Sequence, residues 1–343
     1  MSFAWIYLFC YKLFVCAGDM SLEEIYRPVR EELAVVEELL RERSQSENKA
    51  ISDAVREILS AGGKRLRPAL LLIAAKACSH TSQRAIKLAT AVELIHTASL
   101  VHDDVLDHAN VRRGRPTINS RWGNKVSVLA GDHLYSKAIG ILAEDGDPAV
   151  MHSVSAAACE MTDSETTQAF CRGDVNMTET KYLAIISGKT ASLISCSCRI
   201  GATAGGAASG QADILGDYGR GLGMAFQITD DLLDVTGGKE RLGKPLGNDI
   251  LQGSLTLPFI HAMDVADDKD REWMADAFRS GQIDDGTLAR MRNMVVKYGG
   301  VEYSLARAKE YGRVCKEGLK SLEESKSRTS LAMLADFVVR RAR

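Results

Sequence analysis

The chain has 343 residues, of which 45% are apolar and 26% are charged, and it contains only six prolines. This composition excludes an intrinsically disordered protein, a collagen-like repeat and a disulfide-rich miniprotein. The 43 Lys and Arg residues nearly balance the 45 Asp and Glu residues, so the total charge gives no reason to expect nucleic-acid binding. Any affinity for phosphate must come from local clusters of charge.

Residues 1–20 form an N-terminal extension that is set apart from the rest of the chain, with Met20 as an alternative start. Its apolar stretch is too short to cross a bilayer and lacks the order of charged, apolar and small residues that a signal peptide has. The eight cysteines show no paired metal spacing, which favours free thiols in a reducing compartment. We therefore expect a cytoplasmic protein without a transmembrane segment.

Helical patterns follow one another from Ser21 to the end of the chain, and no stretch alternates Val, Ile and Thr as a strand would. No Pro-, Ser- or Gly-rich linker divides them, so we predict one all-α domain over residues 21–343, a helical bundle around a central cavity. The predicted helices cover residues 21–44, 50–61, 68–78, 84–107, 124–143, 148–171, 178–206, 209–235, 254–266, 269–279, 286–297, 301–322 and 329–342.

Two aspartate clusters end two of the most apolar helices. HDDVLD (residues 102–107) contains Asp103, Asp104 and Asp107, and TDDLLD (229–234) repeats the pattern in the second half of the chain. Residues four apart share a helix face, so the first and last aspartates of each cluster form a clamp. One such cluster is typical of a solvated helix end. Two copies favour a divalent cation with oxygen ligands, Mg²⁺ in particular.

Basic residues accompany these clusters. GGKRLRP (62–68) places three cations after a pair of glycines, where side chains and backbone can wrap an anion. Further cations stand at Arg112, Arg113, Lys189 and Lys244. Each alone is typical of a solvated surface. Together with the acidic clamps, they indicate a site for Mg²⁺-bridged diphosphates.

These motifs resemble those of the trans-prenyl diphosphate synthase family, in the same order and from about residue 21 to the end. The resemblance rests on GGKRLRP, ELIHTASLVHDDVLDHANVRRGRPT (93–117), GKTASL (188–193), GMAFQITDDLLDVTG (223–237) and GKPLGND (243–249). It implies an all-α homodimer that condenses isopentenyl diphosphate with an allylic diphosphate. It also implies Mg²⁺ as cofactor, about three ions per active site, with Mn²⁺ as a substitute.

The resemblance assigns roles residue by residue. Its metal ligands are Asp103, Asp107 and Asp230, supported by Asp104, Asp231 and Asp234. Its contacts to the allylic diphosphate are Arg112, Lys189, Thr190, Gln227 and Lys244. Its isopentenyl diphosphate pocket is Lys64, Arg67, His96 and Arg113. The implied reaction is ionisation, condensation and elimination, with the proton lost to the departing pyrophosphate and the cation stabilised near Lys189, Thr190 and Gln227.

Product length depends on the helix before the first aspartate cluster, along which the growing tail would run. Ser99, Ala98 and Ile95 lie one to two turns before Asp103, and short-chain relatives carry bulky aromatic residues near the first two of these positions. The small residues here predict a product of about C30 to C50, from about 5 carbons per cycle, since less of the tunnel is filled. A passing contact with a membrane surface would help to release such a product.

Three alternatives stay open. One is a synthase of shorter products, and a second is a class I terpene cyclase, which shares the first aspartate motif but has a different second metal motif. The third is a non-catalytic subunit of a heteromeric synthase, although such subunits tend to lose metal aspartates. Relatives also carry a longer loop where this chain has residues 174–178, which bears on product length and assembly.

Replacing Ala98 by Phe is expected to shorten the product, because an aromatic ring at this position would fill the proposed tunnel. The product is measured by chromatography of the dephosphorylated polyprenols. An unchanged distribution of chain lengths would refute the assignment of the tunnel.

Overall fold

The computed structural model describes residues 21–78, 82–112, 114–208, 210–237 and 247–341. The N-terminal extension, Arg113 and Lys244 lie outside these ranges, so their predicted roles stay predictions. Backbone contacts divide the chain into two compact units. Unit 1 comprises residues 1–155, 196–216 and 319–333, and unit 2 comprises residues 156–195, 217–318 and 334–343. The prediction of a single domain stays a prediction.

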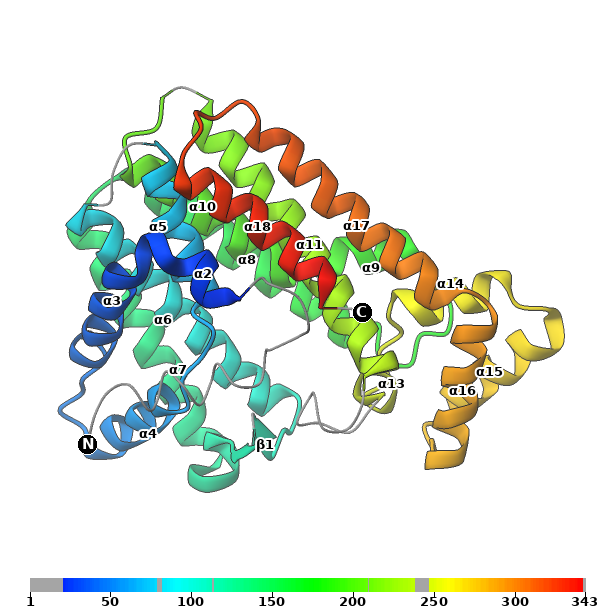
Figure 1. Ribbon diagram of the computed structural model, residues 1–343. Helices are drawn as coiled ribbons and strands as arrows, with labels where there is room; N and C mark the ends of the chain where they lie inside the picture. Colours follow the sequence, from blue (N-terminus) through cyan, green and yellow to red (C-terminus); the bar gives the residue numbers. More distant parts are fainter. Residues whose placement is uncertain (1–20, 79–81, 113, 209, 238–246, 342–343) are drawn as a thin grey trace. The chain divides into compact units, whose positions relative to one another are not determined.

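The all-α class is confirmed, because helices make up nearly all of the regular structure in the described residues (Figure 1). Unit 1 holds α2 (Leu22–Tyr26), η2 (Arg27–Val29), α3 (Arg30–Arg43), α4 (Lys49–Ser60), α5 (Leu66–Cys78), α6 (Gln83–Leu106), β1 (Val111–Arg112), β2 (Arg115–Pro116) and α7 (Ile118–Asp145). Unit 2 holds α9 (Glu179–Ile186), the π-helical turn η3 (Ser187–Ala191), α13 (Asn248–Leu251), α14 (Leu257–Val265), α15 (Asp268–Ser280) and α16 (Asp285–Lys297). Five helices have residues in both units: α8 (Pro148–Phe170), α10 (Ser192–Ala204), α11 (Gln211–Thr236), α17 (Gly300–Leu319) and α18 (Lys326–Arg340).

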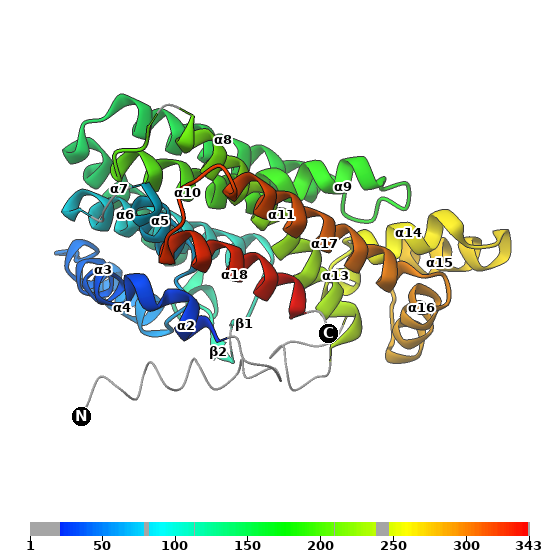
Figure 2. The same cartoon turned by 45° about the horizontal axis from the view of Figure 1, so that its top comes forward.

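The core of unit 1 is built around α6, which packs against α3, α5 and α7 (Figures 1 and 2). Ser82 begins this helix by accepting a hydrogen bond from the Ala85 backbone N–H at 3.4 Å. The neighbouring α5 is apolar all round, and its residues 69–75 have no accessible surface. A helix that is apolar on every side is stable only inside a bundle. Both α5 and α6 therefore lie in the interior of unit 1.

A small β-hairpin corrects the prediction that the chain has no sheet. Strands β1 and β2 pair antiparallel, with Val111 opposite Pro116 and Arg112 opposite Arg115. Gly114 has a left-handed φ of 72°, which a glycine adopts without steric cost in such a tight turn. Each strand has two residues, too few for alternation of side chains to be recognised in the sequence.

The core of unit 2 joins α14 and α16 with the part of α11 that belongs to this unit. Leu257, Phe259, Met291 and Val295 are among its buried side chains. The single helical stretch predicted over residues 178–206 is divided into α9, η3 and α10. The helical phase changes at η3, because a π-helical turn has a longer repeat than an α-helical turn.

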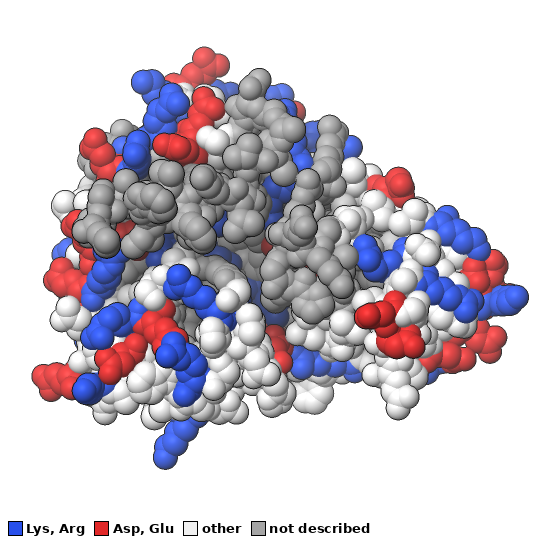
Figure 3. All heavy atoms as spheres, turned by 60° about the horizontal axis from the view of Figure 1, so that its bottom comes forward, with Lys and Arg blue, Asp and Glu red and all other residues white. Residues whose placement is uncertain are grey.

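Charge on the surface is mixed in sign. On the face drawn in Figure 3, blue Lys and Arg side chains are interspersed with red Asp and Glu side chains. This distribution agrees with the near-neutral total charge. Among the described residues, no helix has the length and apolar character needed to cross a bilayer.

Within unit 1, the C-terminal end of α10 approaches α5 through two glycines one turn apart, Gly201 in the helix and Gly205 just after it. A Cβ atom on Gly201 would lie 2.2 Å from the backbone oxygen of Leu71, and one on Gly205 would lie 2.3 Å from that of Ala75. Both distances are far below van der Waals contact. The glycines therefore set how closely these two helix segments pack.

Gly201→Ala is expected to lower the free energy of unfolding by about 2 kcal/mol or more, because the backbone of α5 cannot move aside cheaply. Gly140→Ala on α7 is the matched control, since nothing lies within 4 Å of a Cβ atom there. This control should be neutral or stabilising by up to about 1 kcal/mol. Urea unfolding followed by circular dichroism measures both. Equal effects of the two substitutions would show that the close contact is not the cause.

Candidate active site

Two carboxylates lie one helical turn apart at the C-terminal end of α6, in unit 1. Asp103 belongs to the last turn of the helix, and Asp107 follows it, with its N–H donating to the Asp103 backbone oxygen at 2.8 Å. Both residues are half-buried. Asp107 is the C-cap residue of α6, so the two aspartates lie at the same helix end, and the clamp predicted for them stays a prediction.

Asp104 is buried and is bound within the protein. Its Oδ1 atom accepts a hydrogen bond from Nε of Arg112 at 2.7 Å. The side chain of Asn119 on α7 donates to the backbone oxygens of Asp104 and Ala109, at 3.2 and 3.0 Å. Strand β1 and α7 thus fix the end of α6. Arg112, predicted as a diphosphate contact, lies beside the first aspartate cluster and is half-buried.

Arg67, in the first turn of α5, lies beside His96 of α6. Nη1 of Arg67 lies 2.9 Å from Nε2 of His96, and its Nε is buried without a hydrogen-bond partner among the described residues. A guanidinium has no acceptor, so Nε2 of His96 accepts here and the imidazole carries its proton on Nδ1. Burial lowers the pKa of Arg67 to about 10, and nearby Glu93 opposes this shift. Lys64, on the preceding loop, is exposed.

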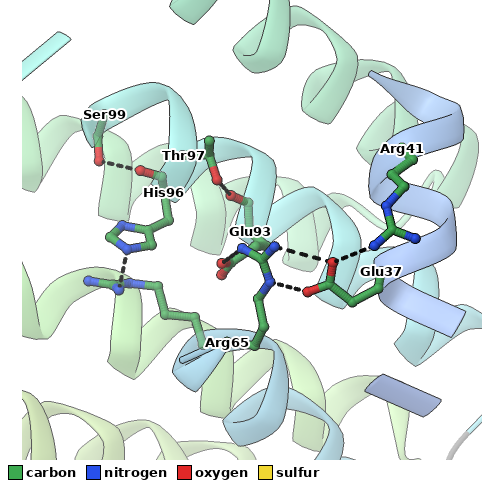
Figure 4. A network of polar contacts seen from close by, with 8 residues as sticks. Glu37, Arg41, Arg65, Glu93, His96, Thr97 and Ser99 are labelled. Atoms are coloured by element: carbon green, nitrogen blue, oxygen red, sulfur yellow. Dashed lines mark hydrogen bonds and ion pairs between the residues drawn. The ribbon is translucent and has the colours of Figure 1, made fainter. Parts of the chain in front are cut away.

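Arg65 points toward two carboxylates, Glu37 and Glu93 (Figure 4). Its guanidinium binds Glu93 on α6, with Nη1 to Oε1 at 2.9 Å, and Glu37 on α3, with Nη2 to Oε2 at 3.2 Å. Burial opposes ionisation, but the two carboxylates raise the pKa of Arg65 above its usual value. The expectation that all three cations of the loop wrap an anion is therefore wrong for Arg65, because its charge is already neutralised inside unit 1.

The three residues predicted to govern product length lie on α6. Ile95 and Ala98 are buried, with 3% and 1% of their surface exposed. Ser99 is half-buried, and its hydroxyl donates to the His96 backbone oxygen at 2.9 Å. Their role in product length stays a prediction.

In unit 2, the second aspartate cluster lies at the C-terminal end of α11, and its three carboxylates have different surroundings. Asp230 is half-buried, with 37% of its side chain exposed. Asp234 accepts hydrogen bonds from the N–H groups of Asn248 and Asp249, at 3.2 and 3.1 Å, and so caps α13. Asp231 is buried in unit 2. Asp231 and Asp234 are therefore bound within the fold, and Asp230 keeps part of its side chain at the surface while it binds Arg341.

Asp231 belongs to a chain of short hydrogen bonds. Thr190 Oγ1 donates to Gln227 Oε1 at 2.7 Å, Gln227 Nε2 donates to Asp231 Oδ1 at 2.7 Å, and the Tyr182 hydroxyl donates to Asp231 Oδ2 at 2.6 Å. Burial raises the pKa of Asp231 to about 7, although the hydrogen bonds from Tyr182 and Gln227 favour its ionised form. This chain brings together the predicted residues Thr190 and Gln227 and adds Tyr182, for which the sequence held no signal.

The π-helical turn η3 carries Lys189 and Thr190. Lys189 Nζ lies 2.7 Å from Gln168 Oε1 and 2.7 Å from Glu165 Oε2 on α8. A Cβ atom on Gly188 would meet the Ser164 hydroxyl at 1.8 Å, so only glycine permits this approach. Turns of this type are frequent at functional sites.

Arg341, just after α18, is a contact that sequence reasoning missed. Its Nη2 donates to Asp230 Oδ1, and its guanidinium lies 4.9 Å from the centroid of the Phe226 ring. In the sequence, Arg341 is one of three arginines in the last four residues. No spacing connects it to an aspartate 111 positions earlier, so only the tertiary structure reveals this pair.

The donor set suits Mg²⁺. Within the described part of the chain, no three carboxylate, imidazole or thiol groups come together closely enough to hold a metal ion by themselves. Mg²⁺ does not require such a cage, because it is usually bound by one or two carboxylates, water and substrate phosphates. The half-buried oxygens of Asp103, Asp107 and Asp230 match this mode of binding.

The chain is similar over nearly its whole length to known prenyl diphosphate synthases. It is 37% identical to the short chain isoprenyl diphosphate synthase of Methanothermobacter thermautotrophicus, over 89% of this chain and 98% of that protein. It is 38% identical to heptaprenyl diphosphate synthase component 2 of Geobacillus stearothermophilus, over 94% of this chain and 99% of that protein.

Solved structures give the same result. The decaprenyl diphosphate synthase of Rhodobacter capsulatus matches with a TM-score of 0.89 at 38% identity, covering 94% of this chain and 99% of that one. A polyprenyl synthase from Caulobacter crescentus CB15, complexed with calcium and isoprenyl diphosphate, also matches with a TM-score of 0.89, at 33% identity and with the same coverage.

The family model described as Polyprenyl synthetase matches residues 48–295, which include both aspartate clusters and the GGKRLRP loop. The predicted resemblance is therefore confirmed. This chain belongs to the polyprenyl synthetase family and is a prenyltransferase of the polyprenyl diphosphate synthase class.

Proposed function

We propose that this enzyme condenses isopentenyl diphosphate with an allylic diphosphate and makes a polyprenyl diphosphate of about C30 to C50, built in units of about 5 carbons. The observation that carries the proposal is the same in both aspartate clusters. The second aspartate of each, Asp104 or Asp231, is buried and hydrogen-bonded within the protein. Asp103, Asp107 and Asp230 are half-buried at the ends of α6 and α11, and Asp230 is also bound by Arg341.

These half-buried aspartates are the proposed ligands of about three Mg²⁺ ions, with Mn²⁺ as a substitute. Bound Mg²⁺ would neutralise the charge that develops on the leaving diphosphate. Asp104, Asp231 and Asp234 would act by orienting the ends of α6 and α11. The related Caulobacter enzyme, which was solved with calcium and isoprenyl diphosphate, supports the use of a divalent cation.

The basic residues divide into two proposed diphosphate pockets. Lys64, Arg67 and His96 would bind isopentenyl diphosphate, joined by Arg113. The buried Nε of Arg67, which has no partner among the described residues, supports this role, because a buried guanidinium N–H without a partner destabilises the protein until an acceptor reaches it. The allylic diphosphate would be bound by Arg112, Lys189, Thr190, Gln227 and Lys244.

Gln227 is suited to hold the allylic carbon as it becomes positive. Both ends of its amide are bound, to Thr190 and to Asp231, so the side chain cannot rotate. Its carbonyl oxygen has a second lone pair that can face a cation. After the isopentenyl double bond attacks the cation, the departing pyrophosphate would take the proton, so no side-chain base is assigned.

The proposed product length rests on Ala98 and Ser99, which leave more room beside α6 than aromatic residues would. The relatives support more than one length, since their names include a heptaprenyl, a decaprenyl and a short-chain synthase. A shorter product is therefore the alternative, and α6 is the element on which the difference would depend.

We propose a catalytically active homodimer in the cytoplasm. The relative from Geobacillus stearothermophilus is named as one component of a synthase, so a heteromeric assembly is the alternative. Both aspartate clusters are complete in this chain, which favours an active subunit. The buried Cys171 and Cys315 are free thiols, in agreement with a reducing compartment. A passing contact with a membrane surface would serve release of an apolar product.

The direct test uses the purified full chain with Mg²⁺, labelled isopentenyl diphosphate and farnesyl or geranylgeranyl diphosphate. The expected result is a ladder of linear polyprenols after dephosphorylation, extending to about C30 to C50 in steps of about 5 carbons. A product that stops at C15 or C20 would support the shorter-chain alternative. Absence of turnover would point to a subunit that needs a partner.

Replacing Asp103 or Asp230 by Asn is expected to lower kcat at least about 100-fold, because each removes an anionic ligand from the charge-stabilising machinery. Asp276→Asn on α15 is the control, since that side chain is exposed and pairs only with nearby Arg279 among the described residues. Steady-state kinetics at several Mg²⁺ concentrations measures the effect. Full activity of both site variants would contradict the assignment of the ligands.

A further inference from the structure

We propose that Arg65, Glu37 and Glu93 form a positioning network for the isopentenyl diphosphate pocket. This inference rests on the proposed function, in which Lys64, Arg67 and His96 bind that substrate. The network itself would not touch substrate. It would hold the loop of residues 62–68 so that Arg67 reaches His96, and it would keep the charge of the pocket positive.

The network ties the loop to two helices of unit 1 (Figure 4). The planar guanidinium of Arg65 binds Glu37 through Nε and Nη2 and binds Glu93 through Nη1. One side chain thus joins α3, the loop and α6. Arg41 adds a weaker contact, with Nη2 lying 3.8 Å from Glu37 Oε2. Only arginine offers a rigid fork that can bind two carboxylates in this way.

The backbone of Arg65 is held in a conformation that needs support. Its φ is 49°, in the left-handed region that residues with a Cβ rarely adopt. Its carbonyl accepts from the Ala69 N–H at 3.0 Å, so this residue begins the first turn of α5. Arg67 follows two residues later. An error in the conformation of Arg65 would therefore move the guanidinium of Arg67 directly.

Two side chains within one turn of α6 bind Arg65 and Arg67. Glu93 and His96 are three residues apart and share a face of the helix, with Glu93 bound to Arg65 and His96 bound to Arg67. Because α6 is packed on α3, α5 and α7, it is a rigid reference for the loop. The distance between the two arginine contacts is thus set by the helix and not by the loop.

The network also neutralises the negative charge of Glu93, which lies near Arg67. Glu93 is 4% exposed and lies close enough to Arg67 to oppose the fall in the Arg67 pKa that burial causes. Without a partner, this carboxylate would repel a diphosphate bound nearby. Arg65 neutralises it, so Glu93 does not cancel the positive charge of Arg67 toward an anion. This explains why a loop with three cations needs the one that faces inward.

The test compares Arg65→Lys with Arg84→Lys in the full-length enzyme. The guanidinium of Arg84 also binds two carboxylates of unit 1, Asp145 at 2.7 and 3.0 Å and Asp147 at 2.6 Å. It lies at the N-terminal end of α6, nine residues before Glu93. Both changes keep the charge and remove a fork. Steady-state kinetics measures KM for each substrate and kcat, and calorimetry with isopentenyl diphosphate alone measures binding without turnover.

We expect Arg65→Lys to raise the Kd and KM for isopentenyl diphosphate about 10-fold, because a displaced contact loses binding even when the charge remains. The KM for the allylic substrate and kcat should stay within about 2-fold. Arg84→Lys should lower Tm but leave both KM values unchanged. Equal KM values for isopentenyl diphosphate in the two variants would overturn the positioning role.

Arg67→Gln distinguishes failure of this inference from failure of the proposed pocket. If Arg67→Gln leaves the KM for isopentenyl diphosphate unchanged, the pocket is wrong and the inference falls with it. If Arg67→Gln raises this KM and Arg65→Lys does not, the network alone is wrong. Should Arg65→Lys fail to fold, Glu37→Gln takes its place, since it weakens one arm of the fork at a half-buried position. Its expected effect is a rise of about 3-fold in the same KM, and no rise would overturn the proposal.

Discussion

An anionic side chain is stable inside a helical bundle only when a donor or a cation replaces the water that it loses. This constraint organises the aspartate cluster of each unit. The buried carboxylates are bound within the protein, and the half-buried Asp103, Asp107 and Asp230 lie at the ends of the two apolar helices, where Asp230 is bound by Arg341. The buried pairs are Glu93 with Arg65, Asp104 with Arg112, and Asp231 with Tyr182 and Gln227.

In unit 1, the polar residues that follow this rule are arranged along one helix, α6. Its apolar residues bury it against three neighbouring helices, which makes it a fixed axis. Along that axis, Glu93 holds the GGKRLRP loop, His96 meets Arg67, and Asp103 ends the helix as a proposed metal ligand. Sites carried on a rigid helix keep their geometry better than sites on loops. The loop gains this rigidity through Arg65.

In unit 2, a local change of helix type has a similar effect. The π-helical turn η3 places Thr190 against Gln227, and α11 places Gln227 against Asp231 one turn later. A regular α-helix through residues 178–206 would distribute Lys189 and Thr190 with a different phase. The close approach at Gly188 permits this turn to pack on α8. Backbone geometry thus positions Thr190 and Gln227 for their proposed roles as much as residue type does.

The sequence alone determined the all-α class and the family, because hydrophobic period and motif spacing are local properties that one chain displays directly. It could not show the hairpin at residues 111–116, whose strands are too short for a pattern. Nor could it show that Arg65 faces inward while Arg67 meets His96, or that Arg341 binds Asp230. These contacts join residues 28 to 111 positions apart. Which of several similar cations is neutralised depends on the carboxylates that packing brings beside it, and only the tertiary structure decides that.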